Sequence, residues 1–318
     1  MQPNSASLVI GIDGGGTKTI AWLAAYDHDL SSGNHRVLGT GSAGPSNQRA
    51  VGPVMAKNNL DTAIEAAFAD AALPRATVAA ACLGLAGADR DSDRRVIEDW
   101  AKVARVAARV EVVNDAIPLL HIDQGDGCGV ALIAGTGSLA WGRNVSGQTA
   151  RSGGWGYLFG DEGSAFSIGR AVLAAVSQAV DGRGEQTALT DAVLQSLHIT
   201  TPQEIIAAVY ANEVPRAVVA QMASLAFSAA AQGDQAANAI LQQAAADLAV
   251  MVLATARRLK LLPLPLLVMT GAVLVQNPEF RQRVSMSIEA ADVQILQTIV
   301  ATDPVAGAVN MACKLAAQ

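Results

Sequence analysis

Two clusters of glycine and small polar residues lie close together in the middle of the chain. The first, Gly135-Thr136-Gly137-Ser138, separates the apolar run at residues 130–134 from a second apolar run. This pattern predicts a tight hairpin with small polar residues at its tip. Because glycine lets the backbone approach a bound group closely, and because N–H and hydroxyl groups suit an anion, the tip is a candidate phosphate loop.

The second cluster begins shortly afterwards with Gly153-Gly154-Trp155-Gly156. It continues with Gly160-Asp161-Glu162-Gly163-Ser164, which runs into a helix-like segment. Two polar clusters so near each other predict one site with two occupants, a phosphate donor and a polar acceptor. Glycine-rich turns that serve only the fold are the alternative, since ordinary loops use the same residues.

A third glycine-rich stretch, Asp13-Gly14-Gly15-Gly16-Thr17-Lys18, follows a short apolar strand at residues 8–12. Thr17 stands where a P-loop has its lysine, and β-favouring residues follow where a dinucleotide fingerprint opens a helix. We therefore expect a strand–loop–strand hairpin whose second strand covers residues 20–26. Asp13 could then hold a water of a phosphate-bound Mg²⁺, and Lys18 could offset phosphate charge. A solvated surface lysine is the alternative for Lys18.

Two further polar residues follow predicted strands. The strand at residues 110–113 ends at Asn114-Asp115, and active-site groups of α/β sheets tend to lie at the carboxyl ends of strands. Asp115 is our candidate general base, accepting the proton of an attacking hydroxyl during phosphoryl transfer; an N-cap of the next helix is the alternative. Asn47, after a strand at residues 36–41, is a candidate hydroxyl-binding side chain, with a turn-forming role as its alternative.

The elements that must position these residues alternate between strands and helices. In the first half we expect a helix from Pro53 to about residue 71, a strand at Val78–Leu85 and a charged, exposed helix at residues 91–105. The second half is mostly helical, with helices expected at residues 164–180, Leu189–Leu197, from Thr201, 214–231 and 234–261. Strands at residues 264–269 and 293–296 and a helix beginning at Pro304 complete the chain. The two strand–glycine–strand loops hint at two related halves.

Composition narrows the class of protein. A chain of 318 residues, 51% hydrophobic and 16% charged, is long enough for two domains. Its net charge of −6 argues against a nucleic-acid or acidic-membrane partner. Cys82, Cys128 and Cys313 form no CxxC pair, so we expect buried thiols in a reducing cytoplasm. With no signal-like start and no apolar run of membrane-spanning length, we expect a soluble, cytoplasmic protein.

Taken together, the segments resemble the N-acetylglucosamine kinase group of the BadF/BadG/BcrA/BcrD ATPase family, within the sugar kinase/Hsp70/actin superfamily. The resemblance spans nearly the whole chain, and GGWG followed by GDEGSA is its most specific part. The matching segments are residues 11–19, 44–47, 83–89, 114–115, 133–138, 153–164, 270–272 and 304–308.

The resemblance implies an α/β fold of two actin-like (ribonuclease H-like) domains around a nucleotide cleft. Residues 1–117 plus 302–318 would form one domain and residues 118–301 the other. It also implies Mg·ATP as the phosphate donor, and a homodimer. Its ATP-binding positions are Gly14, Gly15, Gly16, Thr17, Lys18, Gly135, Thr136, Gly137 and Ser138, with Gly271 and Ala272 beside the adenosine. Asp115 matches the catalytic base, and the sugar-contacting positions are Asn47, Gly87, Asp115, Gly154, Trp155 and Asp161.

The leading hypothesis is therefore an ATP-dependent kinase that phosphorylates N-acetylglucosamine at O6. Glucosamine kinase and N-acetylmuramate or anhydro-sugar kinase stay open, because Ala86 stands where N-acetylhexosamine kinases can carry a serine. An ATPase that activates a partner enzyme is an alternative of another class. The family's dehydratase activators carry an iron–sulfur cluster on paired cysteines, which the cysteines of this chain do not resemble. A sugar-sensing module without catalysis is a third possibility, disfavoured by the intact Asp13, Lys18 and Asp115.

Overall fold

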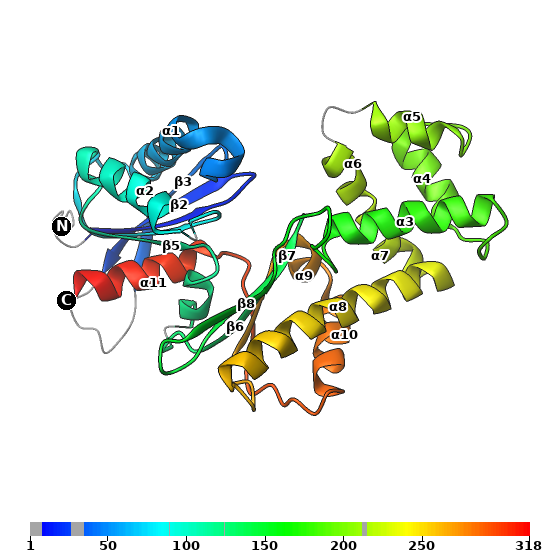
Figure 1. Cartoon of the computed structure of the whole chain (residues 1–318). Coiled ribbons are helices and arrows are strands. Elements are labelled where there is room, and N and C mark those ends of the chain that lie inside the picture. Colours follow the sequence, from blue (N-terminus) through cyan, green and yellow to red (C-terminus); the bar gives the residue numbers. More distant parts are fainter. Residues whose placement is uncertain (1–7, 27–34, 89, 124, 212–214) are drawn as a thin grey trace. The chain divides into compact units, whose positions relative to one another are not determined.

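The chain forms two compact units, seen in a computed structural model that describes residues 8–26, 35–88, 90–123, 125–211 and 215–318 (Figure 1). One unit comprises Met1–Gly127 and Asp303–Gln318, and the other comprises Cys128–Thr302. The first unit continues past the boundary expected after residue 117, because the 3₁₀ helix η2 (Pro118–His121) packs against α11 (Val305–Ala316). Their contact is so close that a Cβ on Gly307 would lie 1.9 Å from the Pro118 carbonyl oxygen.

The first unit is built on a five-stranded mixed sheet with the strand order β3-β2-β1-β4-β5. β1, β2 and β3 form an antiparallel meander, whereas β4 and β5 run parallel to β1. The strands are β1 (Leu8–Gly14), β2 (Thr19–Tyr26), β3 (His35–Ala43), β4 (Val78–Leu85) and β5 (Ala107–Asn114).

Helices cover both faces of this sheet. α1 (Gln48–Asp70) and α2 (Asp91–Val103) lie on one face, and α11 lies on the other (Figure 1). The side chains of β1 therefore alternate between two apolar layers: Ile10 packs on the side of α1 and α2, while Val9 packs on the side of α11. Strands that are buried on both faces read as continuous apolar runs, which is why residues 8–12 and Val78–Leu85 were recognisable as strands. Regular helix in α1 begins after Gly52, at the predicted Pro53.

The second unit repeats this plan. Its sheet has the order β10-β9-β6-β7-β8, with β6, β7 and β8 forming an antiparallel meander and β9 and β10 running parallel to β6. The strands are β6 (Gly129–Ala134), β7 (Ser138–Arg143), β8 (Thr149–Gly153), β9 (Leu267–Thr270) and β10 (Thr298–Val300). The shared topology supports the two related halves that the glycine hairpins hinted at.

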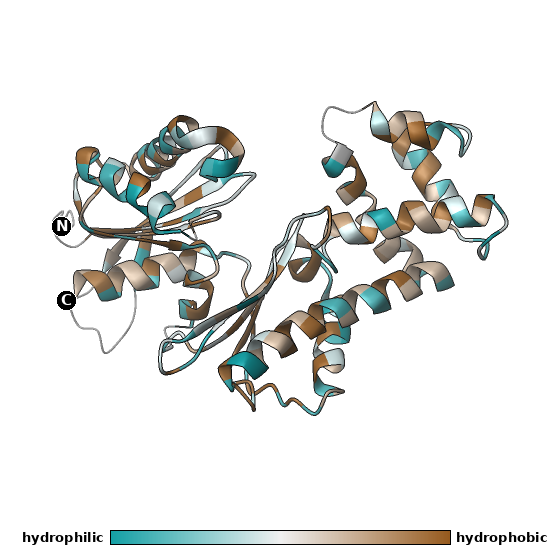
Figure 2. Ribbon diagram, viewed as in Figure 1, coloured by the Kyte–Doolittle hydropathy of each residue, from teal (hydrophilic) through white to brown (hydrophobic). Residues whose placement is uncertain are grey.

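The second unit carries most of the helices. They are α3 (Ala165–Val180), α4 (Leu189–Leu197), α5 (Glu204–Tyr210), α6 (Pro215–Gln221), α7 (Ala223–Ala231), α8 (Gln235–Leu259), α9 (Ala272–Val275) and α10 (Pro278–Glu289). Among the described residues, α8 is the one helix long and apolar enough to cross a membrane (Figure 2). It packs against β6, β7 and β8, and Leu241, Leu248 and Val252 belong to the core of the unit, so α8 is a core helix.

Several predicted elements differ from the structure in their bounds. The strand expected at residues 264–269 begins three residues later, at Leu267, and the helix expected from Thr201 begins at Glu204. The last strand, expected at residues 293–296, contributes only an isolated bridge between Ile295 and Leu264, and β10 starts at Thr298. This edge strand has no apolar alternation to reveal it, since its pattern is exposed, half-buried, exposed. The single helix expected at residues 214–231 is divided into α6 and α7 before Ala223.

Candidate functional site

The first glycine loop, defined as Gly14, Gly15, Gly16, Thr17 and Lys18, is the tip of the β1–β2 hairpin, as predicted. The loop is closed by a hydrogen bond from the Gly15 N–H to the Lys18 carbonyl (2.9 Å). Gly16, Thr17 and Lys18 are exposed, and a Cβ on Gly16 would meet nothing within 4 Å. The tip therefore presents its backbone and its lysine to solvent or to a ligand.

Backbone contacts fix the base of this loop. The Gly15 carbonyl accepts N–H groups from Ser46 (3.1 Å) and Asn47 (3.2 Å), and the Gly14 carbonyl accepts the Ala86 N–H (2.8 Å). The loop before α1 and the turn after β4 are thereby attached to the hairpin. The predicted sugar-contacting residues of the first unit thus lie beside the predicted phosphate loop.

Asn47 and Gly87 are direct neighbours. A Cβ on Gly87 would lie 2.8 Å from Asn47 Oδ1, and Gly87 has a φ of +85°, a region that favours glycine. Asn47 Oδ1 accepts the Arg49 N–H (3.0 Å), so the residue is the N-cap of α1. The capping contact uses the oxygen of the side chain, which leaves the Nδ2 amide as the group that would meet a hydroxyl. Asp89, the last residue of the neighbouring motif, lies outside the described residues.

Asp13 and Asp115 lie at the carboxyl ends of β1 and β5, on either side of β4. Asp13 is paired with Gly84 of β4, and a Cβ on Gly84 would lie only 3.6 Å from the Asp115 Cα. The same Cβ would lie 2.8 Å from the Pro118 ring, so glycine at position 84 lets η2 pack closely against β4 beside the two aspartates. The N-cap of η2 is Ile117, so the capping alternative for Asp115 is wrong.

The charges at this edge of the sheet oppose each other. The pKa of Asp13 is raised to about 7, mainly by burial and also by the negative charge of Asp115, while the positive charge of Lys18 acts in the opposite direction. The first unit therefore holds two carboxyl groups whose joint ionisation is unfavourable without a nearby cation. Among the described residues, no group of three or more His, Cys, Asp or Glu side chains could hold a metal ion by itself.

The second glycine loop, defined as Gly135, Thr136, Gly137 and Ser138, is the tip of the β6–β7 hairpin, again as predicted. The Gly135 N–H donates to the Gly137 carbonyl (2.9 Å), and the Gly135 carbonyl accepts the Ala165 N–H (2.8 Å) at the start of α3. Thr136 is exposed at the tip. The loop is thus anchored to the helix that follows the second polar cluster.

Asp161 connects the two clusters. It is only 4% exposed, and its Oδ1 accepts the Ser138 N–H (3.3 Å). A Cβ on Gly137 would lie 2.9 Å from both carboxylate oxygens, so only glycine allows this contact. The Ser138 hydroxyl donates to the Glu162 carbonyl (2.6 Å), and the Ser138 carbonyl accepts the Gly154 N–H (2.9 Å). The structure therefore brings predicted ATP-binding and sugar-contacting residues of this unit together.

An arginine that sequence reasoning missed completes this cluster. Arg216 of α6 donates from Nη2 to Asp161 Oδ2 (3.1 Å), and its guanidinium carbon lies 4.9 Å from the centroid of the Tyr157 ring. Trp155, in contrast, is 72% exposed. No local pattern links Arg216 to Asp161, because 55 positions separate them in the sequence.

Gly271 lies against the second glycine loop. A Cβ at this position would be 2.3 Å from the Ala134 carbonyl oxygen and 2.9 Å from the Gly135 nitrogen, and the residue has a φ of +92°. Gly271 is the N-cap of the one-turn helix α9, and Ala272 is its exposed first residue. The predicted adenosine segment therefore adjoins the predicted phosphate loop of the same unit.

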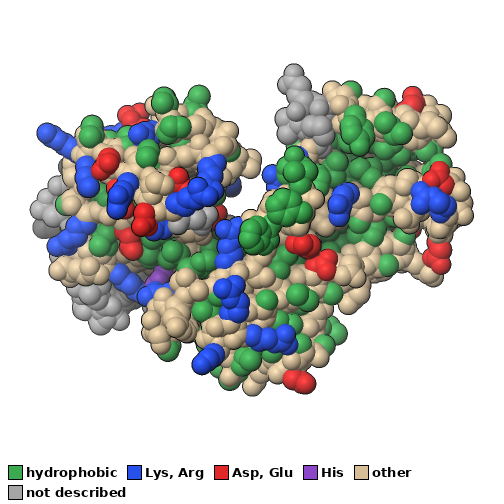
Figure 3. Space-filling model, in the orientation of Figure 1, with side chains coloured by type: hydrophobic (Ala, Val, Ile, Leu, Met, Phe, Trp, Pro, Cys, Tyr) green, Lys and Arg blue, Asp and Glu red, His purple; other side chains and the backbone are tan. Residues whose placement is uncertain are grey.

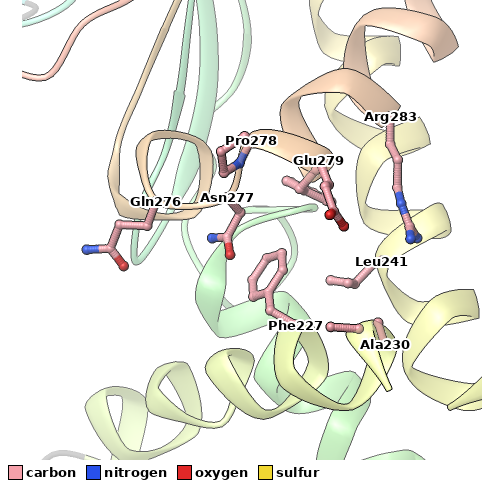
Figure 4. A pocket seen from close by; sticks show the side chains of 10 residues that line it. Phe227, Ala230, Leu241, Gln276, Asn277, Pro278, Glu279 and Arg283 are labelled. Carbon is pink, nitrogen blue, oxygen red and sulfur yellow. The ribbon is translucent and has the colours of Figure 1, made fainter. Parts of the chain in front are cut away.

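A pocket of about 300 Å³ opens at the other end of α9 (Figure 4). Phe227 and Leu241 give it an apolar side, and Gln276, Asn277 and Glu279 give it amide and carboxyl groups. Phe227 is held in place by an edge-to-face contact with Phe280, with ring centroids 5.4 Å apart. The remaining lining residues are Ala230, Ala231, Pro278, Phe280 and Arg283.

Comparison with known proteins decides the family. Residues 10–312 match the BadF/BadG/BcrA/BcrD ATPase family. The chain belongs to this family. A relative in Clostridium acetobutylicum, named N-acetylmuramic acid/N-acetylglucosamine kinase, is 32% identical over 284 residues, which are 88% of this chain and 90% of the relative. The N-acetyl-D-glucosamine kinase of Dictyostelium discoideum is 35% identical over 251 residues, which are 76% of each chain.

A solved structure agrees with this placement in the BadF/BadG/BcrA/BcrD ATPase family. The Chromobacterium violaceum protein, provisionally named an N-acetylglucosamine kinase, superposes with a TM-score of 0.73 at 29% identity. The superposition covers 99% of this chain and all of that one. The two-domain, actin-like α/β fold expected for a member of the family is confirmed.

Proposed function

We propose that this member of the BadF/BadG/BcrA/BcrD ATPase family is an ATP-dependent amino-sugar kinase that transfers the γ-phosphoryl group of ATP to O6 of N-acetylglucosamine. The observation that carries the proposal is the edge of the first sheet, where Asp115 and Asp13 lie with the first glycine loop. The kinase names of the two relatives support the same reaction and sugar class.

The two glycine loops would hold the phosphates of ATP. Each loop is a hairpin tip with small residues, where backbone N–H groups suit an anion. Lys18 is exposed beside Gly16 and Thr17, so its ammonium group would offset phosphate charge. Residues 14–18 and 135–138 belong to different units, and we propose that each unit contributes one loop.

The pocket at α9 would receive the adenine base. α9 is a single turn, about 6 Å long by helix geometry, so the pocket begins about one sugar ring away from Gly271 and the phosphate loop. Its volume of about 300 Å³ admits a purine. The ring of Phe227 offers an apolar surface to the base (Figure 4). The Asn277 side chain points towards this ring, and because its Nδ2 donates to the Val273 carbonyl (2.9 Å), it would offer its amide oxygen to the polar edge of the base.

Asp13 fits a role beside a hydrated Mg²⁺. The pKa of Asp13 is raised mainly by burial and then by the charge of Asp115, so a nearby cation would favour the ionised carboxylate. Mg²⁺ bound to ATP keeps several waters and uses few protein ligands. Asp13 would hold one of these waters. The ion would offset the charge of the β- and γ-phosphates when bound.

Asp115 would act on the sugar hydroxyl. Its carboxylate accepts the proton of O6 while this oxygen bonds to the γ-phosphorus and the bond from phosphorus to the bridging oxygen of ADP breaks. The products are the sugar 6-phosphate, ADP and a proton that leaves from Asp115. Asn47, Gly87, Gly154, Trp155 and Asp161 would bind the other groups of the sugar.

We also propose a cytoplasmic homodimer that binds neither nucleic acid nor membranes. Lys and Arg side chains are interspersed with Asp and Glu side chains on the visible face of the first unit, and hydrophobic side chains gather over the helical part of the second unit (Figure 3). Ile206 and Tyr210 of α5 are 69% and 79% exposed. Such exposed apolar side chains support a contact between copies.

N-acetylmuramate is the second candidate acceptor, because the Clostridium acetobutylicum relative is named for both sugars. Glucosamine remains a third. The alternative of an iron–sulfur ATPase activator is not supported by the cysteines: Cys82 and Cys128 are buried, Cys313 is half-buried, and the sequence holds no CxxC pair.

The test is ADP release from Mg·ATP in the presence of N-acetylglucosamine, glucosamine, N-acetylmannosamine, N-acetylmuramic acid, glucose or no sugar. We expect release to depend strongly on N-acetylglucosamine. Asp115→Asn should lower kcat by roughly 10²- to 10⁴-fold, the usual effect of a general base, and leave sugar binding nearly unchanged. Slow release indifferent to every sugar would favour the partner-activating ATPase. Near-normal turnover of Asp115→Asn would refute its role as the base.

A further inference from the structure

Asp161 is a buried carboxylate whose two oxygens have different partners. Asp161 Oδ1 faces the backbone of the second glycine loop, and Oδ2 faces Arg216. Asp161 has a φ of +58°, which is unusual for a residue other than glycine. A strained residue of this kind persists only where its surroundings fix it, and such residues cluster at functional sites.

The Arg216 side chain is 39% exposed, against 6% for that of Asp161, and an aromatic ring supports it. Its guanidinium group lies over Tyr157, whose ring meets Phe166 of α3 edge-to-face at 5.2 Å. α6 itself cannot move towards α3, because a Cβ on Gly169 would lie 1.8 Å from the Val219 carbonyl oxygen. Arg216 is therefore presented to Asp161 by a helix with a closely defined position.

The pairing also controls what Asp161 can do. A carboxylate offers about four acceptor positions, of which the Ser138 N–H and Arg216 occupy two. The remaining acceptor positions can take hydrogen bonds from hydroxyl groups. The Nε atom of Arg216 is buried and has no hydrogen-bond partner among the described residues. The ion pair with Asp161 is therefore the main polar contact of the Arg216 side chain.

We propose that Arg216 is a positioning residue for the sugar acceptor: it holds the Asp161 carboxylate in a fixed orientation between the second glycine loop and α6, and thereby sets the KM for the sugar rather than the KM for ATP. The proposal rests on the proposed kinase function. Arg216 acts through Asp161 and touches neither reacting atom.

The experiment measures kcat and both KM values for Arg216→Met, which removes the charge and keeps much of the length, and for Arg216→Lys. The control is Arg183→Met, because Arg183 pairs with Asp181 at 2.7 Å in the same unit but with both side chains more than half exposed. We expect Arg216→Met to raise the sugar KM about 10- to 100-fold, the loss typical of an oriented charged hydrogen bond, and the ATP KM less than about 3-fold. Arg216→Lys should recover part of the loss, and Arg183→Met should behave like the wild type.

A double variant separates positioning from a structural role. In the background of Asp161→Asn, adding Arg216→Met should raise the sugar KM no further, because the group through which Arg216 acts is gone. This double variant also removes the unpaired buried charge, which protects the test against a folding failure of the single variant.

Two outcomes overturn the proposal: an unchanged sugar KM in Arg216→Met, or additive effects of the two substitutions. Isothermal titration of the same variants with N-acetylglucosamine alone gives a readout without turnover. If the wild type phosphorylates no sugar, the proposed function has failed. If the wild type is active and the effects are additive, only the role of Arg216 has failed.

Discussion

At the scale of single residues, the edge of the first sheet brings together two aspartates whose like charges repel each other. Asp13 and Asp115 are held near each other by the pairing of β1, β4 and β5, and the glycine at position 84 lets Pro118 of η2 pack closely beside them. Placing two carboxylates so close together is unfavourable in free energy, and such arrangements are typical of sites where the charges take part in a reaction or in binding. Burial is the larger cause of the raised pKa of Asp13, and the charge of Asp115 adds to it.

The titration of Asp13 makes stability depend on pH. Its pKa is about 7 in the folded protein, against an ordinary value of 3.8 for an aspartate in an unfolded chain, so the folded state binds the proton more tightly. The contribution to the free energy of unfolding is fully present below pH ~4 and is lost as the pH rises to ~7. Asp13→Asn removes this loss, so its stability relative to the wild type should grow by about 2 to 3 kcal/mol between pH 5 and pH 8.

Urea unfolding of both proteins at several pH values measures this difference. Asp99→Asn is the matched control, because Asp99 lies in an exposed pair with Lys102 at 3.7 Å. Parallel stability curves for the wild type and Asp13→Asn would mean that Asp13 is not desolvated as described. The sequence had identified Asp13 and Asp115 separately, but their mutual repulsion depends on strand order and was not predictable from either motif.

At the scale of elements, close backbone contacts decide where helices lie. Gly307 lets α11 meet η2, and η2 begins three residues after Asp115. Alanine is intrinsically better than glycine in a helix by up to about 1 kcal/mol. Here the new Cβ would face a backbone oxygen at 1.9 Å, which cannot rotate away.

We therefore expect Gly307→Ala to lower the free energy of unfolding by about 1 to 3 kcal/mol, since overpacking outweighs helix propensity. The midpoint of urea denaturation measures the effect, and turnover should fall with it because η2 supports the turn that carries Asp115. Ala306→Ser, next in the same helix and partly exposed, is the control. A stabilised Gly307→Ala would show that η2 can shift at little cost.

The elements also show what local patterns reveal. Val78–Leu85 and Leu189–Leu197 were predicted with the bounds that they have, because one is a continuous apolar run and the other has helical spacing. β8 was not predicted, since its sequence TARSG buries a single residue and forms an edge. Both glycine hairpins were predictable from short stretches, whereas Arg216 and the pocket at α9 arise from residues that are distant in sequence.

At the scale of the whole molecule, the residues that we propose for ATP binding belong to both units. A nucleotide that binds only the folded protein raises its stability by about 2.7 kcal/mol at a concentration of 100 times Kd. If both loops contribute, Lys18→Met in the first unit and Ser138→Ala in the second should each reduce the thermal shift produced by a non-hydrolysable ATP analogue with Mg²⁺.

A thermal unfolding series with increasing analogue concentration measures these shifts. Lys102→Met, a substitution of an exposed lysine in α2, should leave the shift at the wild-type value. If one loop variant loses the shift while the other keeps it entirely, the nucleotide is bound by a single unit.

The discontinuity of the first unit has a consequence for synthesis on the ribosome. Its sheet has an apolar face, including Val9, Ala24 and Cys82, that α11 covers, and α11 follows the entire second unit in the chain. The unit translated first is therefore the last to be completed. Until α11 emerges, the nascent chain carries a finished second unit and an open apolar face, which is the interval when it depends most on chaperones.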